Sequence, residues 1–330
     1  MSVLEEIRSR AHRRKRRIVL PEGEDERVIA ASAKAQADGL ATITLLGNEQ
    51  SIRDKLAKSR HDTKGLTIID PSMVETDYLV NEFLSLQTQR RTREEDARLL
   101  VREPLNYAAM MVRMGEADGT VGGAVSTTAD TVRAAGSIIG KRAGCKTISS
   151  FFLMICEAEH FEKKGAFIFA DCAKTVEPTS EILANTAILA AEVARQFLNE
   201  EPRIAMLSFS TAGSASHPKV TKVQDATEMV KRDAPDLTVY GDLQFDSAFV
   251  PMVAAKKAPD SPIQGDANVF IFPSLEAGNI GYKIAERIGG AVAIGPVLMG
   301  LAKPANDLSR GCSEQDVYDM IAITAAQVQD

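Results

Sequence analysis

The sequence predicts an α/β protein with two domains, each containing a mainly parallel sheet with helices on both faces. The chain has 330 residues, a length that fits about two domains. Short β-rich segments alternate with amphipathic helical segments, which is typical of parallel sheets. The chain is 45% hydrophobic and 25% charged, an ordinary balance for a globular protein.

The first half carries this alternation most clearly. Val3, Ile7 and Ala11 mark one face of a first helix. We expect strands at residues 17–20, 41–46, 66–69 and 118–125. We expect further helices at residues 25–37, 52–57, 81–102, 104–115 and 127–139.

The composition argues against several classes of protein. The basic run at residues 13–17 ends the first helix without interleaved aromatic residues, which favours a solvated helix end over a nucleic-acid surface. The chain has no apolar run of about 18 residues and no signal-like start, so we expect a cytoplasmic protein without membrane contact. The cysteines show neither disulfide nor zinc spacing, so we expect four reduced thiols and no metal: Cys145, Cys156, Cys172 and Cys312.

The second half repeats the alternation after a change of composition near residues 143–147. Strands are expected at 148–155, 165–170, 203–209 and 268–272, and helices at 180–197, from 218 and from about 276. In three places a small-residue loop joins a strand to a helix, although none of these loops is a Walker or Rossmann motif. With Arg133, Lys283 and Arg310 close to these loops, the pattern favours a ligand with several phosphate groups.

Two helix starts in the chain carry polar residues that suit chemistry. Thr127 and Asp130 form a cap pattern, and free N–H groups at that helix start would bind an anion, with Arg133 one turn further on. The segment 306–316 places a hydroxyl, a guanidinium, a thiol and carboxylates together before the last helix. Within this segment, Ser313 and Asp316 also fit a simple capping box, so Asp316 is either a cap or a catalytic group.

Several blocks in this order resemble the phosphate acetyltransferase family. They cover most of the chain from about residue 118 onward, and residues 17–22 resemble the family more loosely. The matching blocks are residues 124–133, 206–211, 241–246, 271–283 and 303–311.

The resemblance implies transfer of an acetyl group between coenzyme A (CoA) and phosphate, by direct attack of the CoA thiolate on acetyl phosphate in a ternary complex. Ser309 would donate a hydrogen bond to the thioester oxygen, Arg310 would hold phosphate, and Asp316 would accept the thiol proton. An ordinary aspartate is a weak base, so this role requires desolvation. The expected substrate-binding residues are Thr127, Thr128, Arg133, Asn279, Tyr282 and Lys283.

The resemblance also implies a fold like that of isocitrate and isopropylmalate dehydrogenases. The first domain would then comprise residues 1–145 and about 305–330, and the second residues 146–304, with the active site in the cleft between them. Family members are commonly homodimers, and CoA serves as a substrate, so no cofactor is expected.

Two departures from the family pattern and three alternative functions accompany this prediction. Ser126 stands where the family often has histidine, and Gln87 stands where it often has arginine, although Arg90 or Arg91 could reach the same place. The alternatives are a propionyl or butyryl transferase, an inactive binding protein, and a metal- and NAD-dependent oxidoreductase. The oxidoreductase would need Asp242 and Asp246 as metal ligands.

Overall fold

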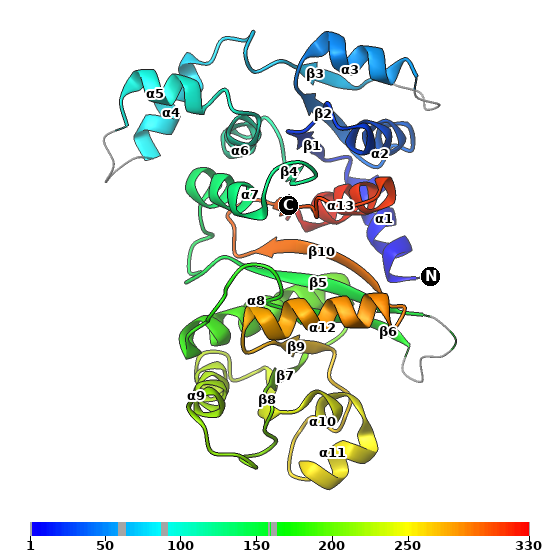
Figure 1. Ribbon diagram of the computed structural model, residues 1–330, viewed down its shortest axis with the longest axis vertical. Helices are drawn as coiled ribbons and strands as arrows, with labels where there is room; N and C mark the ends of the chain where they lie inside the picture. Colours follow the sequence, from blue (N-terminus) through cyan, green and yellow to red (C-terminus); the bar gives the residue numbers. More distant parts are fainter. Residues whose placement is uncertain (1, 59–63, 87–91, 158, 160–163, 330) are drawn as a thin grey trace. The chain divides into compact units, whose positions relative to one another are not determined.

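The computed structural model describes residues 2–58, 64–86, 92–157, 159 and 164–329 and divides into two compact units (Figure 1). Unit 1 comprises Met1–Ala143 and Leu301–Asp330, and unit 2 comprises Gly144–Gly300. The sequence placed these boundaries at 145 and about 305. Strands and helices alternate in both units, which makes the chain an α/β protein. Gln87, Arg90 and Arg91 lie outside the described residues.

Unit 1 contains a five-stranded sheet in the order β11-β4-β1-β2-β3, and each neighbouring pair is parallel. The edge strand β11 comes from the end of the chain and pairs with β4, so Asp307 lies beside Gly122. This pairing brings the segment before the last helix to the end of β4. The strands are β1 Arg17–Leu20, β2 Thr42–Leu46, β3 Thr67–Ile69, β4 Gly119–Gly122 and β11 Ala305–Asp307.

Helices cover both faces of this sheet. A Cβ at Gly119 would lie 2.7 Å from Thr324 in α13, and one at Gly122 would lie 3.1 Å from Leu105 in α6. Because residues three apart in a strand point to opposite faces, α13 and α6 cover opposite sides. Figure 1 shows α1 beside α13. The helices are α1 Val3–Arg14, α2 Glu26–Ala37, α3 Glu49–Leu56, α4 Asp77–Leu86, α5 Glu94–Leu100, α6 Pro104–Met114, α7 Thr128–Ala134 with the π-helix η1 Ala135–Ile139, and α13 Glu314–Gln327.

The single helix expected at residues 81–102 is wrong, because the structure has two helices there, α4 and α5. Arg98 of α5 pairs with Asp77 at the start of α4 and with Glu94. In one continuous helix, Asp77 and Arg98 would lie about 30 Å apart. The pair therefore holds α5 folded back toward α4.

Unit 2 contains a six-stranded sheet in the order β10-β5-β6-β9-β7-β8. The pairs that β5 makes with β10 and β6 are antiparallel, and the others are parallel. Two of its strands, β8 and β10, were not expected from the sequence; β10 contains Gly295 and Pro296, which weaken a strand pattern. The strands are β5 Ser149–Cys156, β6 Gly165–Ala170, β7 Arg203–Leu207, β8 Thr238–Leu243, β9 Val269–Ile271 and β10 Val292–Met299.

Neighbouring residues of β5 show how this second sheet is covered. Phe151 packs against Phe197 of α8, with ring centroids 6.1 Å apart, whereas Phe152 stacks on Tyr282 of α12 at 3.9 Å. Adjacent strand residues point to opposite faces, so α8 and α12 lie on opposite sides of the sheet. The helices are α8 Ser180–Phe197, α9 Pro218–Asp233, α10 Phe245–Phe249, α11 Pro251–Lys257 and α12 Leu275–Arg287.

The structure also bears on the composition arguments. The basic run closes α1, where cationic side chains favour the negative end of the helix dipole, and Arg17 pairs with Asp118. All four cysteines are free thiols. Within the ranges that the structure describes, no helix is long and apolar enough to cross a membrane.

Candidate active site

Unit 1 contains a cavity of about 970 Å³ at the carboxyl ends of its central strands. Pro21 follows β1, Gly47 follows β2 and Val125 follows β4, and all three line the cavity. The chain leaves β1 toward β2 on one side, whereas β4 pairs with β1 on the other. Ligands of open α/β sheets bind at such a switch point. Thr127 and Arg133 also line the cavity.

The backbone N–H groups before α7 are already occupied by a carboxylate. Glu22, which follows β1, accepts hydrogen bonds from the N–H groups of Ala124 at 2.6 Å, Val125 at 3.1 Å and Ser126 at 2.7 Å. These three groups precede the N-cap Thr127, so they are not the helix-start N–H groups that the sequence predicted to be free for an anion. Glu22 fixes the loop between β4 and α7.

The start of α7 has the predicted cap. Thr127 is the N-cap and accepts from the N–H of Asp130 at 3.2 Å. Arg133 donates to Asp130 at 2.6 Å, but 71% of its side chain is exposed. Arg133 is therefore positioned to bind an anion in the cavity. Thr128 donates its hydroxyl to Asp307 Oδ2 at 2.6 Å, which ties α7 to the end of β11.

Asp307 is a buried carboxyl with few partners. The residue is completely buried, and its Oδ1 accepts no hydrogen bond from the residues that the structure describes. Burial raises the pKa of Asp307 to about 6. A Cβ at Gly123 would lie 2.2 Å from Oδ1, and Gly123 has φ +103°, so only glycine fits beside this carboxyl.

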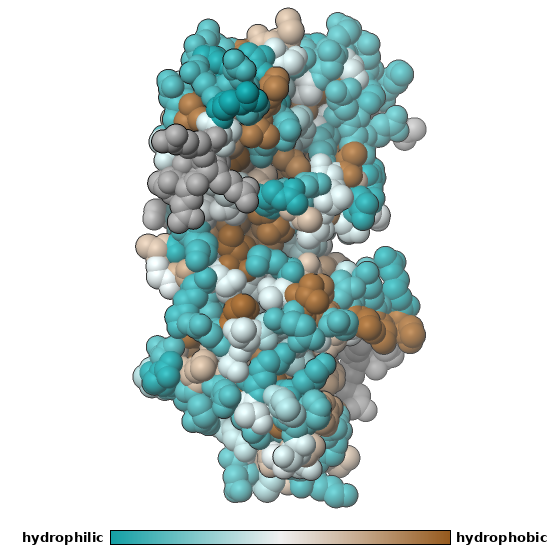
Figure 2. Space-filling view, turned by 60° about the vertical axis from the view of Figure 1, so that its left-hand side comes forward, coloured by the Kyte–Doolittle hydropathy of each residue, from teal (hydrophilic) through white to brown (hydrophobic). Residues whose placement is uncertain are grey.

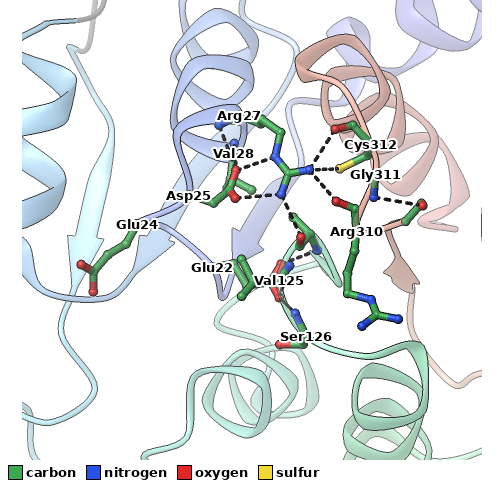
Figure 3. A network of polar contacts seen from close by, with 12 residues as sticks. Glu22, Glu24, Asp25, Arg27, Val28, Val125, Ser126, Arg310, Gly311 and Cys312 are labelled. Carbon is green, nitrogen blue, oxygen red and sulfur yellow. Dashed lines mark hydrogen bonds and ion pairs between the residues drawn. The ribbon is translucent and has the colours of Figure 1, made fainter.

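The loop Leu308–Ser313 presents two exposed polar side chains, Ser309 and Arg310. Ser309 Oγ accepts from the N–H of Gly311 at 3.2 Å and is exposed, so its own proton is available to a ligand. The exposed Arg310 guanidinium has no hydrogen bond or ion pair to any described residue. In Figure 3 this side chain extends away from Arg27. The loop therefore offers a hydroxyl donor and a free cation.

Asp316 forms the capping box that the sequence left open as an alternative. Its Oδ2 accepts from the N–H of Ser313 at 2.7 Å and from the Ser313 hydroxyl at 2.9 Å. The side chain is exposed rather than desolvated. Among the described residues nothing donates to Oδ1, so one oxygen remains open to a proton.

Arg27 was missed by the sequence prediction. Its guanidinium donates to the backbone oxygens of Arg310 at 2.8 Å, Cys312 at 3.0 Å and Ala124 at 2.8 Å (Figure 3). It also forms two bonds to Asp25, the N-cap of α2. Arg27 comes two residues after the N-cap Asp25, where a sequence pattern predicts an ordinary solvent-exposed side chain.

The three site residues predicted on α12 belong to unit 2. Asn279 donates to the backbone oxygen of Cys172 at 3.1 Å, and Tyr282 stacks on Phe152. Burial raises the pKa of Tyr282 to about 12. Lys283 is exposed, with its Nζ 5.8 Å from the centre of the Tyr282 ring. Asn279 and Tyr282 thus have structural contacts, while Lys283 extends into solvent.

The two acids that the oxidoreductase alternative required do not share a helix face. Asp242 lies in strand β8, and its carboxylate accepts a hydrogen bond from Gln224 at 2.9 Å. Asp246 lies in α10 and forms an ion pair with Lys257 at 2.8 Å. The part of the chain that the structure describes contains no group of three or more potential metal ligands. Asp242 and Asp246 therefore do not form the pair of metal ligands that the oxidoreductase alternative required.

Comparisons with known proteins cover the whole length of the chain. Residues 2–325 match the family described as phosphate acetyl/butaryl transferase. A phosphate acetyltransferase from Paracoccus denitrificans is 47% identical over 329 residues, covering 100% of both chains. A phosphotransacetylase structure from Streptococcus pyogenes is 45% identical with a TM-score of 0.92, covering 99% of this chain and 98% of that chain.

A more distant structure shares the fold alone. A 4-hydroxythreonine-4-phosphate dehydrogenase from Burkholderia phymatum is 13% identical with a TM-score of 0.51, covering 95% of this chain and 98% of that one. The dehydrogenase-like fold is thereby supported from outside the acyltransferases. From its family match and its full-length relatives, the chain belongs to the phosphate acetyl/butaryl transferase family.

Proposed function

We propose that this chain is a phosphate acetyltransferase, which moves an acetyl group reversibly between acetyl-CoA and inorganic phosphate. The observation that carries this proposal is the loop Leu308–Ser313, where Ser309 and Arg310 are both exposed. Among the described residues, neither the Ser309 hydroxyl proton nor the Arg310 guanidinium has an acceptor. A serine without a base is a weak nucleophile, and among the described residues no histidine is hydrogen-bonded to Ser309. The loop therefore suits binding and stabilisation of a reacting acyl phosphate better than formation of an acyl-serine.

The transfer step can be assigned to three side chains of this chain. In the direction of acetyl-CoA synthesis, Asp316 accepts the thiol proton of CoA through its open Oδ1. The thiolate forms a bond to the acetyl carbon, and the carbon–oxygen bond to phosphate breaks with its electron pair leaving on phosphate. Ser309 donates to the carbonyl oxygen as charge develops there, and Arg310 holds the departing phosphate with two parallel hydrogen bonds.

The exposed position of Asp316 limits when it can act as a base. A carboxylate in water binds protons weakly, whereas a desolvated one binds them more strongly. Bound CoA and acyl phosphate would exclude water from this side chain. We therefore expect proton transfer only in the ternary complex, which agrees with direct transfer rather than a two-step exchange.

Release of free thiol from acetyl-CoA and phosphate tests the function. The wild type should release CoA only when phosphate is present, and Asp316→Asn should lower kcat by about a hundredfold, because general-base catalysis contributes factors of this order. Glu314→Gln is the matched control, since Glu314 is an exposed acid in the same first turn of α13. Absence of phosphate-dependent thiol release by the wild type would contradict the function.

The acyl-chain preference within the family is a second question. The full-length relative from Paracoccus denitrificans is named as an acetyltransferase, which supports acetyl over propionyl or butyryl. Comparing kcat/KM for acetyl-, propionyl- and butyryl-CoA tests this, and the largest value should belong to acetyl-CoA. A preference for butyryl-CoA would contradict the acetyl assignment and indicate a phosphate butyryltransferase.

The predicted binding residues complete the proposal. Arg133 lines the cavity of unit 1, and its exposed guanidinium suits a phosphate group of CoA. Thr127 and Thr128 form the start of α7 beside it, and Asn279, Tyr282 and Lys283 remain predicted contacts to substrate. Lys283→Ala should raise KM for CoA more than it lowers kcat, because an exposed cation contributes to binding rather than to bond making.

We also propose that the protein is a cytoplasmic homodimer. Ile280, Ile284 and Ile288 follow each other at a spacing of four on α12 and are 56%, 54% and 85% exposed, and Figure 2 shows hydrophobic residues on the surface of this unit. Such a stripe favours a partner. Ile284→Lys should shift the mass measured by light scattering from dimer to monomer, and a wild-type monomer would contradict the proposal.

A further inference from the structure

The guanidinium of Arg27 uses every one of its donors inside the protein. A guanidinium has five N–H bonds in a fixed fork. Nε and one Nη2 proton go to Asp25, at 3.0 and 2.8 Å. The other Nη2 proton goes to the backbone oxygen of Ala124, and the two Nη1 protons go to those of Arg310 and Cys312. Arg27 therefore has no donor left for a substrate phosphate.

These bonds connect three segments that are distant in the sequence. Asp25 begins α2, Ala124 belongs to the loop that Glu22 fixes before α7, and Arg310 and Cys312 belong to the loop before α13. Figure 3 shows the guanidinium of Arg27 between these segments, with Arg310 carrying its own side chain away from it. One side chain thus sets the spacing between the loop before α7, which lines the cavity, and the loop Leu308–Ser313, called the catalytic loop below.

The two carbonyl groups in the catalytic loop determine where its side chains point. Fixing the oxygen of Arg310 orients the peptide plane that follows Arg310, and fixing the oxygen of Cys312 orients the one that precedes Ser313. Ser313 is the N-cap of α13, the helix that carries Asp316. The hydrogen bond to Asp25 raises the pKa of Arg27 above its ordinary value, so the cation persists across the working pH range.

Lysine cannot replace arginine in this arrangement. An ammonium group has three donors on a flexible stem, whereas the five bonds of Arg27 diverge in one plane toward four residues. Arg27→Lys keeps the charge and removes the fork, which separates the electrostatic contribution from the geometric one.

We propose that Arg27 is a positioning residue for the acyl transfer, which holds the backbone of the Arg310 loop and the start of α13 in the reactive arrangement without touching substrate. This inference rests on the proposed function, because it assigns Arg27 to the same reaction. A reactive group displaced by about 1 Å can lose a hundredfold in rate, so a backbone clamp of this kind affects turnover strongly.

Steady-state kinetics of Arg27→Lys and Arg27→Gln test the proposal, with Arg53→Lys as the matched control. Arg53 is an arginine of α3 whose side chain bonds only to Glu49 among the described residues. We expect Arg27→Lys to lower kcat by about 10- to 100-fold while KM for CoA and phosphate changes little. Arg53→Lys should keep the wild-type kcat. A full kcat for Arg27→Lys, or a loss confined to KM, would overturn the proposal.

A double-mutant cycle separates positioning from a general loss of structure. If Arg27 acts through Arg310, Arg27→Lys should cost a much smaller factor in an Arg310→Ala background than in the wild type. An equal factor in both backgrounds would overturn the proposal. If the Arg27 variants do not fold, Asp25→Asn provides the same test. Asparagine keeps the cap of α2 but weakens the hydrogen bonds that anchor Arg27. An unchanged kcat in Asp25→Asn would also count against the proposal. A wild type without thiol release would instead reject the proposed function itself.

Discussion

Two loops that follow buried strand ends, one in each unit, satisfy their polar groups in opposite ways. In unit 2, Asp171 follows β6 and accepts from the Ser150 hydroxyl and from the N–H groups of Ala173, Lys174 and Thr175. The aspartate thereby ties down its own loop. Both carboxylate oxygens of Asp171 are used in this way, so the aspartate has a structural role in its loop.

In unit 1, Asp307 ends β11, and the next loop is held from outside instead. Asp307 accepts from the Thr128 hydroxyl, and Arg27 of α2 holds the backbone of the loop. Among the described residues, the Arg310 side chain therefore takes no part in forming the loop, and the Ser309 side chain contributes only by accepting from the N–H of Gly311. A catalytic loop can keep its reactive groups free only if other elements supply its rigidity.

Removing the carboxylate from the structural loop should have the largest effect on stability. Asp171→Ala leaves three backbone N–H groups and a buried hydroxyl without their acceptor, and bonds to charged groups contribute about 1.5–3 kcal/mol each. We expect a loss of roughly 4 kcal/mol in the free energy of unfolding, measured by urea titration. A loss below about 1 kcal/mol would mean that the loop has other support.

Removing the guanidinium from the loop Leu308–Ser313 should affect activity rather than stability. Arg310→Ala should lower kcat/KM by about 10²- to 10³-fold, as expected for a group that stabilises developing charge. The free energy of unfolding should change by less than about 0.5 kcal/mol, because an exposed, unpaired side chain is removed. Arg232→Ala, an exposed arginine of α9 paired with Asp233, is the control and should alter neither quantity.

Asp307 should make the stability of unit 1 depend on pH. Burial raises its pKa from 3.8 to about 6, so the folded state binds a proton more tightly than the unfolded state. Its contribution to stability is then highest below about pH 4 and is lost as the pH rises through about 6. A shift of this size corresponds to roughly 3 kcal/mol at most.

The variant Asp307→Asn removes this titration while keeping an oxygen for Thr128. We expect the variant and the wild type to be similarly stable at about pH 4, and the variant to be more stable by about 2 kcal/mol at pH 7.5. Urea titrations of both proteins at several pH values measure the difference. If the difference were independent of pH, Asp307 would not carry the titration.

The parts of this molecule that were predictable from sequence are those fixed by residues close together in the chain. The caps at Thr127 and Ser313 and the proline at the start of α9 were read correctly, because each depends on neighbours within one helical turn. Strand β10 was missed because Gly295 and Pro296 interrupt its pattern. The helix expected at residues 81–102 was wrong because the polar sequence shows no boundary between α4 and α5.

The concentration of polar groups in the loop Leu308–Ser313 was visible in the sequence, but the support of this loop was not. The residue types around Ser309 and Arg310 concentrate reactive groups in one short segment. By contrast, Arg27 bonds to Arg310 across 283 positions, and Glu22 bonds to Ser126 across 104. No local pattern indicates such contacts, because they depend on how the parallel strands place their carboxyl ends together.

The smallest expected effect concerns the two roles of Asp316. Ser313→Ala removes the hydroxyl from the capping box, which should lower the free energy of unfolding by about 1 kcal/mol. The N–H of residue 313 still donates to Asp316 Oδ2, so the carboxylate should keep its orientation, and most of kcat should remain. Unfolding curves and thiol-release rates of Ser313→Ala measure both quantities. If kcat instead fell as far as in Asp316→Asn, the Ser313 hydroxyl would be needed to orient the base, and the capping and catalytic roles of Asp316 would depend on a single hydrogen-bonded unit.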